Sequence, residues 1–548
     1  MPRDNSTEAL EESAPAADPN EIHTLEEGKR FSESMLWDLQ RRYFDEKGIG
    51  AWAEGQVPSF ITTNAVMARS YARIVHGFLR DALAWQDGGI NLDHPIYVIE
   101  LGAGSGRLGF HFIKKFADIM AHSPINGLDV RLVMTDFPER TLESWQANPK
   151  LRALVDAGKL DFARFDMEQD AELYLTESGV TLSPGDVVNP VIVLANYVFD
   201  GIRHDVFFLE AGELKEGLVK VLCSKALPKE LDTALFDEIA LDFDKNDMDA
   251  DYYGDPDLDG ILEEYKDRLA QTALLFPAAG MDCIRRLAAL SGGRMLMLAS
   301  DKGYLHEENL IGHPAPSLVS HGSFSLSVNF HALGRFVNRR GGQVIDTPYK
   351  PSNLATAAWV LGSPEDGLAE TRLAFYDAVV AGGMDDFFSV TRHMAHAIPE
   401  MSLDDLISYL RFGGWDATMF AACASNIEGK LTESTHDQQR ECYNALMEMW
   451  DNYLPIGEEM DLPFFMGTLL YKLEHFEEAH TFLKRSLDDH GEDAATYYNL
   501  GLALRKLNKL SKALKALERA HEMRPGDDMI KTLLISVRAD VKKGDGKK

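Results

Sequence analysis

The stretch Ile96-Tyr-Val-Ile-Glu-Leu-Gly-Ala-Gly-Ser-Gly-Arg-Leu-Gly109 decides the fold of the first half of the chain. It begins with four β-favouring residues, continues through three alternating glycines (Gly102, Gly104, Gly106) and enters an apolar helical stretch at Leu108. A strand, a glycine-rich turn and a helix in this order form a nucleotide-binding βα unit. Glycines lack the Cβ atoms that would hold a ligand away from the backbone.

Further apolar runs on either side of this unit alternate with helical stretches. From Pro95 to about Arg335 the runs are Val130–Val133, Val191–Leu194, Val206–Phe208 and Met295–Leu298. Such alternation predicts an α/β fold in which helices cover both faces of a sheet. We therefore expect a Rossmann-like domain, followed by an all-helical domain after about Gly341, where the strand signals fade.

Acidic residues after neighbouring strands indicate which nucleotide the domain binds. Asp136 follows the predicted strand Arg131–Thr135, and Asp166 follows at the place of a third strand. Carboxylates accept hydrogen bonds from ribose hydroxyls and an adenine amino group, but they would repel a pyrophosphate. Glu100 suits a cationic sulfonium. The predicted ligand is S-adenosylmethionine (SAM), and its predicted binding residues are Glu100, Gly102, Ala103, Gly104, Gly106, Asp136, Asp166 and Met167.

Two other patterns in the sequence resemble sites for different ligands. Gly104-x-Gly106-x-x-Gly109 also satisfies the dinucleotide pattern, so an NAD-dependent enzyme is an alternative. Asp255, Asp257, Asp259 and Gly260 resemble the start of a calcium-binding EF-hand loop. Position twelve of that loop falls on Lys266, where a bidentate glutamate is needed, so we predict no metal site.

Composition shifts divide the chain into segments. We expect a disordered acidic tail at 1–30, the α/β domain at 31–340 with a helical lead-in, a helical connecting region at 341–430 and helical repeats at 431–548. Residues 241–268 form a predicted acidic insertion inside the α/β domain.

A repeat of 34 residues near the C-terminus predicts helical hairpins. Gly467, Ala479 and Leu483 recur as Gly501, Ala513 and Leu517. Together with Tyr497, Ala520 and Pro525, these spacings resemble the tetratricopeptide consensus. Small residues let two antiparallel helices approach closely, Pro525 ends the second helix, and residues 529–542 could cap the stack. Such repeats predict a protein partner.

The formal net charge of −32 makes nucleic acid a poor partner, because the chain would repel a phosphate backbone. No apolar run reaches the roughly 18 to 20 residues of a membrane span. Cys223, Cys283, Cys423 and Cys442 lie far apart, without a zinc-binding pair. Together with the absence of a leader-like apolar stretch in the first thirty residues, these observations favour the cytoplasm.

Three segments together resemble the MidA-like SAM-dependent methyltransferases. They are Glu100-Leu-Gly-Ala-Gly-Ser-Gly106, Ala195-Asn-Tyr-Val-Phe-Asp-Gly201 and Gly322-Ser-Phe-Ser-Leu-Ser-Val-Asn-Phe330. The resemblance covers roughly Pro58 to Phe336, with Pro58–Thr63 in the place of the segment before the first strand. It implies a class I methyltransferase domain, with an arginine-bearing protein as one acceptor. The family usually has Asn-Glu at Asn196-Tyr197 and Pro-Val at Arg203-His204.

The predicted catalytic residues are Asn196, Asp200 and His204. Asn196 follows the presumed fourth strand, where acceptors dock in open α/β sheets. Asp200, with Asp205 nearby, could orient a guanidinium, and His204 could take a proton. His321 and His331 are expected in packing or loops. The predicted function is a SAM-dependent methyltransferase whose repeats recruit a protein substrate; the alternative is a repeat scaffold with a degenerate, non-catalytic SAM domain.

Overall fold

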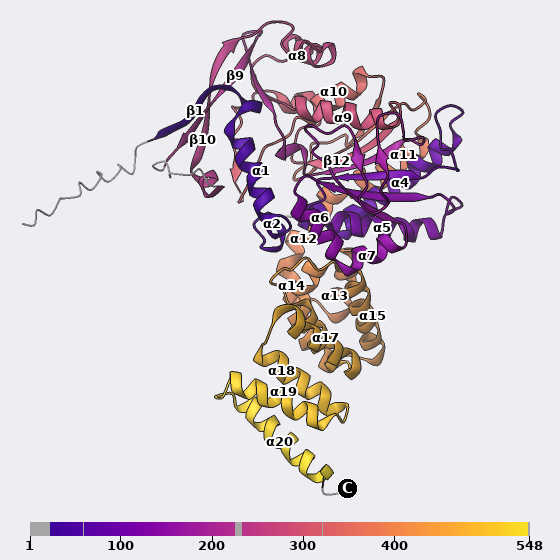
Figure 1. The fold of residues 1–548 in the computed structure, drawn as a ribbon, viewed down its shortest axis with the longest axis vertical. Helices are drawn as coiled ribbons and strands as arrows, with labels where there is room; N and C mark the ends of the chain where they lie inside the picture. The colour runs from indigo at the N-terminus through magenta and orange to yellow at the C-terminus, as the bar shows by residue number, and fades with distance from the viewer. Residues whose placement is uncertain (1–21, 58–59, 225–232, 321, 546–548) are drawn as a thin grey trace, which may run out of the picture.

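A seven-stranded sheet forms the centre of the first domain in the computed structural model, which describes residues 22–57, 60–224, 233–320 and 322–545 (Figure 1). The strand order is β15-β16-β12-β7-β2-β3-β4. Its strands are β2 (Ile96–Leu101), β3 (Val130–Asp136), β4 (Leu160–Arg164), β7 (Val191–Asn196), β12 (Met295–Asp301), β15 (Gln343–Asp346) and β16 (Ala355–Leu361). β16 runs antiparallel to its two neighbours, and the other adjacent pairs are parallel. The order of the parallel strands reverses between β2 and β7, which is where such sheets bind ligands.

Helices cover both faces of this sheet, as the sequence predicts. Alternate residues of β2 point to opposite cores: Val98 packs with α4 (Ala65–Ala84), α5 (Arg107–Ala121) and α11 (Ala369–Phe375). Ile99 belongs to the opposite core, which includes residues of α9 (Ala278–Leu290) and α10 (Phe330–Arg339), and α8 (Pro256–Arg268) packs on α10. All six residues of β2 are buried, because a parallel strand between two helical layers has no solvent face.

The prediction that residues 341–430 are entirely helical is wrong. β15 and β16 lie in this range and complete the sheet. β16 reads Ala-Thr-Ala-Ala-Trp-Val-Leu, and alanine is a weak strand former, so the segment gives little local strand signal. It becomes a strand because it pairs with β12 along seven residues and is buried throughout. The α/β domain therefore continues to β16, and α11 packs against its helix α4.

A second sheet lies beside the first, and one of its strands lies within the segment predicted as a disordered tail. It contains β1 (His23–Arg30), β8 (Asp205–Glu210), β9 (Glu213–Cys223), β10 (Ile239–Asp247) and β11 (Thr272–Phe276). Residues 23–30 were expected in the disordered tail, but they pair antiparallel with β9. Their polar side chains give little strand signal in the sequence. The strand forms because its backbone pairs with β9. Residues 1–21 lie outside the described residues. The apolar run at 206–208 belongs to this sheet and not to the central one.

The predicted acidic insertion is regular structure. Residues 241–247 continue β10, and Asp255 is the N-cap of α8, where it accepts hydrogen bonds from the backbone N–H groups of Asp257 and Leu258. The EF-hand-like residues therefore start a helix, and Gly260 lies inside it. In the described ranges no cluster of three or more His, Cys, Asp or Glu side chains is placed to hold a metal ion.

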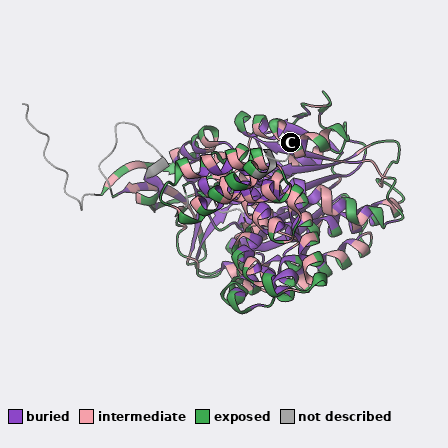
Figure 2. Ribbon diagram, turned by 90° about the horizontal axis from the view of Figure 1, so that it is seen from below, coloured by how far each residue is buried: buried purple, intermediate pink, exposed green. Residues whose placement is uncertain are grey.

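The C-terminal region is all-helical and extends away from the α/β domain as a stack (Figure 1). Seen from below, exposed residues lie along the outside of the helical ribbons and buried residues lie in the interior of the molecule (Figure 2). Its helices are α12 (Met384–Met394), α13 (Leu403–Phe412), α14 (Ala417–Lys430), α15 (His436–Asn452), α16 (Leu462–Lys472), α17 (Phe476–His490), α18 (Ala494–Lys506), α19 (Leu510–Met523) and α20 (Asp528–Asp545). No helix in the described ranges has the length and apolarity needed to cross a membrane.

The predicted 34-residue repeat is confirmed by contacts that recur at the same spacing. A Cβ atom on Gly467 would lie 2.6 Å from Cγ of Leu483, and one on Gly501 would lie 2.6 Å from Cγ of Leu517. α19 ends at Met523, just before Pro525, and α20 packs on α19. The glycines therefore allow each helix pair to pack closely, as in tetratricopeptide-like hairpins.

Gly501→Val is expected to destabilise the repeats by about 2 to 3 kcal/mol, because the added side chain overlaps the fully buried Leu517. Thermal unfolding of the full-length chain measures the shift. Gly526→Val is the control, since a Cβ atom there meets nothing within 4 Å. Equal shifts for the two variants would contradict the packing argument.

The first domain contains further α-helices and strands. They are α1 (Met35–Lys47), α2 (Gly50–Ala53), α3 (Phe60–Thr63), α6 (Glu139–Ala147), α7 (Pro149–Asp156), β5 (Leu173–Tyr174), β6 (Thr181–Leu182), β13 (Val319–Ser320) and β14 (Phe324–Ser325).

Candidate functional site

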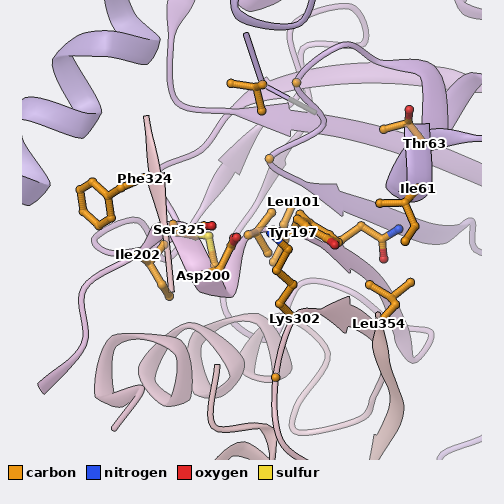
Figure 3. Close-up of a pocket in the computed structure, with 18 of the residues that line it drawn as sticks. Ile61, Thr63, Leu101, Tyr197, Asp200, Ile202, Lys302, Phe324, Ser325 and Leu354 are labelled. Atoms are coloured by element: carbon orange, nitrogen blue, oxygen red, sulfur yellow. The ribbon is translucent and has the colours of Figure 1, made fainter. Parts of the chain in front are cut away.

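A cavity of about 640 Å³ opens at the carboxyl ends of β2, β3 and β7. Figure 3 shows Phe324, Ser325 and Ile202 on one side, Ile61, Thr63 and Leu354 on the other, and Asp200, Tyr197 and Lys302 between them. Its size falls in the range of small-molecule sites. The cavity lies at the reversal point of the strand order, where the topology places a ligand site.

The glycine turn forms part of the cavity wall. Gly102, Ala103 and Gly104 line the cavity, and the two glycines have φ angles of 54° and 51°. Residues other than glycine rarely adopt this backbone conformation. A Cβ atom on Gly104 would lie 2.6 Å from Cζ2 of Trp52. The carbonyl of Gly104 accepts a hydrogen bond from the indole of Trp145 (3.0 Å), so the turn is held from both sides.

Asp136, at the end of β3, is placed beside this turn. Its Oδ2 accepts a hydrogen bond from the N–H of Gly104 (3.0 Å), and its Oδ1 accepts one from the N–H of Phe137 (2.9 Å). Burial raises the pKa of Asp136 to about 6, although the two backbone hydrogen bonds oppose the shift. The carboxylate lines the cavity in a fixed orientation, as predicted for a ribose-binding acid.

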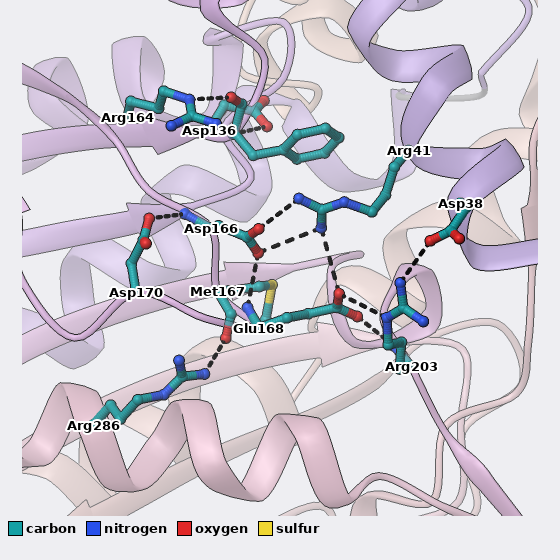
Figure 4. Close-up of polar contacts among 11 residues, drawn as sticks. Asp38, Arg41, Asp136, Arg164, Asp166, Met167, Glu168, Asp170, Arg203 and Arg286 are labelled. Atoms are coloured by element: carbon teal, nitrogen blue, oxygen red, sulfur yellow. Dashed lines mark hydrogen bonds and ion pairs between the residues drawn. The ribbon is translucent and has the colours of Figure 1, made fainter. Parts of the chain in front are cut away.

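Asp166 and Met167 also line the cavity, but Asp166 has a charged partner that the sequence did not indicate. Both of its oxygens pair with the guanidinium of Arg41, which also reaches Glu168 at 3.4 Å (Figure 4). Glu168 in turn pairs with Arg203 at 3.2 Å. The carboxylates on this wall are therefore largely neutralised within the protein.

Glu100 and Gly106 were predicted to bind the ligand, but neither lines the cavity. Glu100 is buried under α5, where a Cβ atom on Gly109 would lie 2.3 Å from its Oε2. Burial raises the pKa of Glu100 to about 8, so it is mostly protonated at neutral pH. Successive side chains of a β-strand point to opposite faces, and the side chain of Glu100 points toward α5 and not into the cavity. Gly106 instead packs against Met134 and Trp145.

Asn196 lines the cavity at the end of β7, as predicted. Its Oδ1 accepts a hydrogen bond from the hydroxyl of Tyr71, and the oxygen of that hydroxyl lies 2.8 Å from the hydroxyl of Ser300, whose proton it can accept. The next residue, Tyr197, has a φ of 50°, which is unusual for a side chain of this size. The backbone is therefore strained at the point where this chain departs from the family motif.

His204 does not fit the predicted role of proton acceptor. It is fully buried, its ring bonds the carbonyl of Phe199 through Nε2 (2.7 Å), and it does not line the cavity. Burial lowers its pKa to about 4. His331 packs on Tyr265 through a 2.9 Å hydrogen bond, as expected for a packing residue, and His321 lies outside the described residues. Asp205 accepts a hydrogen bond from Tyr253 (2.6 Å) and does not line the cavity.

Asp200 lines the cavity, and a second acid stands behind it. The backbone N–H of Asp200 donates to Oδ2 of Asp301 (3.0 Å), and the two side chains are within hydrogen-bonding reach. Burial raises the pKa of both carboxyls, and the nearby Lys302 opposes this. Sequence reasoning missed Asp301, although it follows the apolar run of β12 just as Asp136 follows that of β3.

The N-terminal lead-in covers the cavity, which sequence reasoning also missed. Four lining residues lie at positions 37, 40, 41 and 44 of α1: Trp37, Gln40, Arg41 and Phe44. This i, i+3, i+4, i+7 spacing places the four residues on one face of the helix. The polar residues Gln40 and Arg41 on an otherwise apolar face were the sequence signal that this face lines a site. The stacked rings of Phe44 and Trp52 lie 5.6 Å apart, centroid to centroid, and connect α1 to the glycine turn.

The helical region is tied to the other side of the glycine turn. Arg107, directly after Gly106, donates to the carbonyl of Leu454 (3.1 Å) and pairs with Glu458. Lys150 at the start of α7 donates to the carbonyls of Trp450 and Tyr453 (both 2.6 Å). Cations near the C-terminus of α15 complement its dipole. The end of α15 and the loop that follows it are therefore anchored to α5 through Arg107 and to α7 through Lys150.

Comparison with known proteins supports the repeats. Residues 473–525 match the tetratricopeptide repeat family. No curated protein matches the chain.

Three solved structures show a limited likeness. A COG1565 superfamily protein from Burkholderia thailandensis is 15% identical, with a TM-score of 0.33 over 57% of this chain and 72% of its own. Another member from that bacterium, bound to S-adenosyl-homocysteine, is 14% identical, with a TM-score of 0.34 over 57% and 73%. MamA from Desulfovibrio magneticus RS-1 is 19% identical, with a TM-score of 0.24 over 30% and 88%.

Proposed function

We propose that the chain is a SAM-dependent methyltransferase of the class I, MidA-like type. The observation that carries this proposal is the pairing of the glycine turn with Asp136 in one cavity wall. Asp136 would accept hydrogen bonds from the ribose hydroxyls, and the Gly102–Gly104 backbone would contact the methionine part. SAM supplies a methyl group activated by the positive sulfur.

The cavity offers a fitting place for the adenine. Phe137, Met167 and Ile202 line it with apolar surface suited to a flat base. Asp166 accepts two hydrogen bonds from Arg41 and one from the N–H of Glu168 (3.0 Å), which leaves acceptor capacity for an amino group. The guanidinium carbon of Arg41 lies 4.5 Å from the ring centroid of Phe137. Arg41 therefore contacts both Asp166 and Phe137, the polar and the apolar part of this place.

A dinucleotide fits less well. Its pyrophosphate would need the N-terminus of the helix after the glycine turn. Gly106 does not line the cavity, and Arg107 is engaged with the helical region. These contacts favour SAM over NAD.

Titration calorimetry of the full-length chain with SAM and with NADH tests the proposal. We expect SAM to bind with a Kd in the range of about 1 to 100 μM and NADH to give no heat. Absence of SAM binding would overturn the proposed function and favour the repeat scaffold. Tight NADH binding that is weakened by Asp136→Ala would favour the dehydrogenase alternative.

We further propose that the acceptor is a protein recruited by the repeats. Arg107 and Lys150 bind the end of α15 and the loop that leads into the repeat stack, which places the start of the stack beside the glycine turn. The net charge of −32 disfavours a nucleic acid. The MidA-like resemblance implies an arginine acceptor. The four cysteines are buried and unpaired, which suits the cytoplasm. Incubation with radiolabelled SAM and a whole-cell protein extract would identify the acceptor; SAM binding without labelling would favour a non-catalytic scaffold.

A further inference from the structure

Of the described residues, four acidic side chains line the cavity, and they differ in their partners. Asp136 accepts hydrogen bonds from two backbone N–H groups. Asp166 and Glu168 pair with Arg41. The side chain of Asp200 instead has another acid, Asp301, as its neighbour. Asp200 is therefore the lining acid whose carboxyl is not already neutralised by a guanidinium or fixed by two backbone donors.

Asp301 is held from behind by the backbone. It is 0% exposed, and its Oδ1 accepts the N–H of Lys302 (2.7 Å) while its Oδ2 accepts the N–H of Asp200 (3.0 Å). Asp200 is 6% exposed and faces the cavity. One member of the pair can thus meet a ligand, and the other acts only through its neighbour.

Two carboxyls in contact in an apolar environment do not both ionise, because their charges repel and burial disfavours each charge. They retain one proton between them and carry about one negative charge. The groups that face the pair are Lys302 from the loop after β12, Tyr197 after β7 and Tyr71 of α4. Lys302 offsets the remaining negative charge and extends into the cavity (Figure 3).

We propose that the Asp200–Asp301 pair receives the proton that the acceptor loses during methyl transfer, with Asp200 as the catalytic residue and Asp301 as its positioning residue. This inference rests on the proposed function. The pair can take up one proton, since it starts with one proton for two carboxyls. The pair takes the role of proton acceptor that the sequence suggested for His204, which is buried and does not line the cavity.

The step balances without another reactant. The acceptor's nitrogen or oxygen forms a bond to the methyl carbon while the bond between that carbon and sulfur breaks and leaves its electron pair on sulfur. The acceptor's proton passes to the carboxylate of Asp200. The products are the methylated acceptor, S-adenosylhomocysteine and a fully protonated carboxyl pair.

Infrared titration of the full-length chain tests the pair without turnover. All variants carry Glu100→Gln, because the raised pKa of Glu100 would add its own protonated-carboxyl band. We expect a band that persists above pH 7, where Asp136 is largely ionised. In Asp200→Asn the band should titrate at lower pH, because Asp301 keeps its buried carboxyl but loses the repelling neighbour. The band should titrate at lower pH in Asp301→Asn, which removes the repelling neighbour, and at higher pH in Lys302→Met, which removes the attracting cation. Unchanged titration in all three variants would overturn the inference.

Methyl transfer provides the second readout, with radiolabelled SAM and the whole-cell protein extract as acceptor. We expect Asp200→Asn to lower turnover by about 100-fold or more while the Kd for SAM stays within about threefold. Asp301→Asn should move the acidic limb of the pH profile to lower pH. Retained turnover in Asp200→Asn, with SAM still bound, would overturn the inference alone. Loss of SAM binding by the unsubstituted chain would instead overturn the proposed function.

Discussion

Replacing Asp136 with asparagine is expected to weaken SAM binding by about 100-fold or more. Two hydrogen bonds to a charged group contribute about 1.5 to 3 kcal/mol each, and about 1.4 kcal/mol corresponds to a tenfold change in affinity. Both oxygens of Asp136 also accept backbone N–H groups, from Gly104 and Phe137. Asparagine has a single acceptor oxygen, so one of these N–H groups would lose its partner and the glycine turn would loosen.

Calorimetry with SAM measures the effect, and Asp129→Asn is the matched control. Asp129 lies just before the same strand, pairs with Arg131 at 2.7 Å and does not line the cavity. The control should keep the Kd of the unsubstituted chain. A Kd for Asp136→Asn within threefold of the control would show that the cavity wall is not the ribose site.

The pH dependence of the same measurement follows from the raised pKa of Asp136, about 6. Below that pH the carboxyl is protonated, so SAM affinity should fall as the pH falls through 6. The effect on stability has the opposite sign. The folded pKa lies above the unfolded value of about 3.9, so protonation favours the folded state and this contribution is lost as the pH rises from about 4 to 6. SAM affinity that is constant between pH 5 and 8 would contradict the assignment.

The sequence was sufficient to predict the βα unit and the acids that follow its neighbouring strands. Gly102, Gly104, Asp136 and Asp166 line one cavity because parallel strands end at the same edge of a sheet. The face of each strand residue was harder to predict. Glu100 lies in an entirely buried strand, where apolar neighbours on both sides give no alternation to show which face it takes.

Features that depend on contacts distant in sequence were not predictable from local patterns. β1 has a polar sequence and forms because β9 offers an edge, and β16 is rich in alanine and forms between β12 and β15. Arg41 meets Asp166 across 125 residues. His204 carries a suitable side chain for proton transfer, but only the structure shows that it is fully buried and does not line the cavity.

Gly104→Val is expected to abolish measurable SAM binding and to lower the melting temperature. A non-glycine residue at φ 51° costs about 1 to 2 kcal/mol, and a β-branched residue costs more. In addition, its Cβ atom would lie 2.6 Å from the ring of Trp52, so either the turn or α2 must move. Movement of the turn also breaks the hydrogen bond from Gly104 to Asp136, and the two parts of the proposed site separate.

Two comparisons separate backbone strain from this collision. Gly179→Val is the matched control, because Gly179 has a φ of 70° but a Cβ atom there meets nothing within 4 Å. It should lower stability through strain alone, and therefore less than Gly104→Val, and it should leave SAM binding intact. In a double-mutant cycle of Gly104→Ala and Trp52→Ala, removal of the indole should recover part of the stability lost at Gly104. Additive effects would mean that Trp52 does not restrain the turn, and binding losses in Gly179→Val as large as in Gly104→Val would mean that the turn has no direct role.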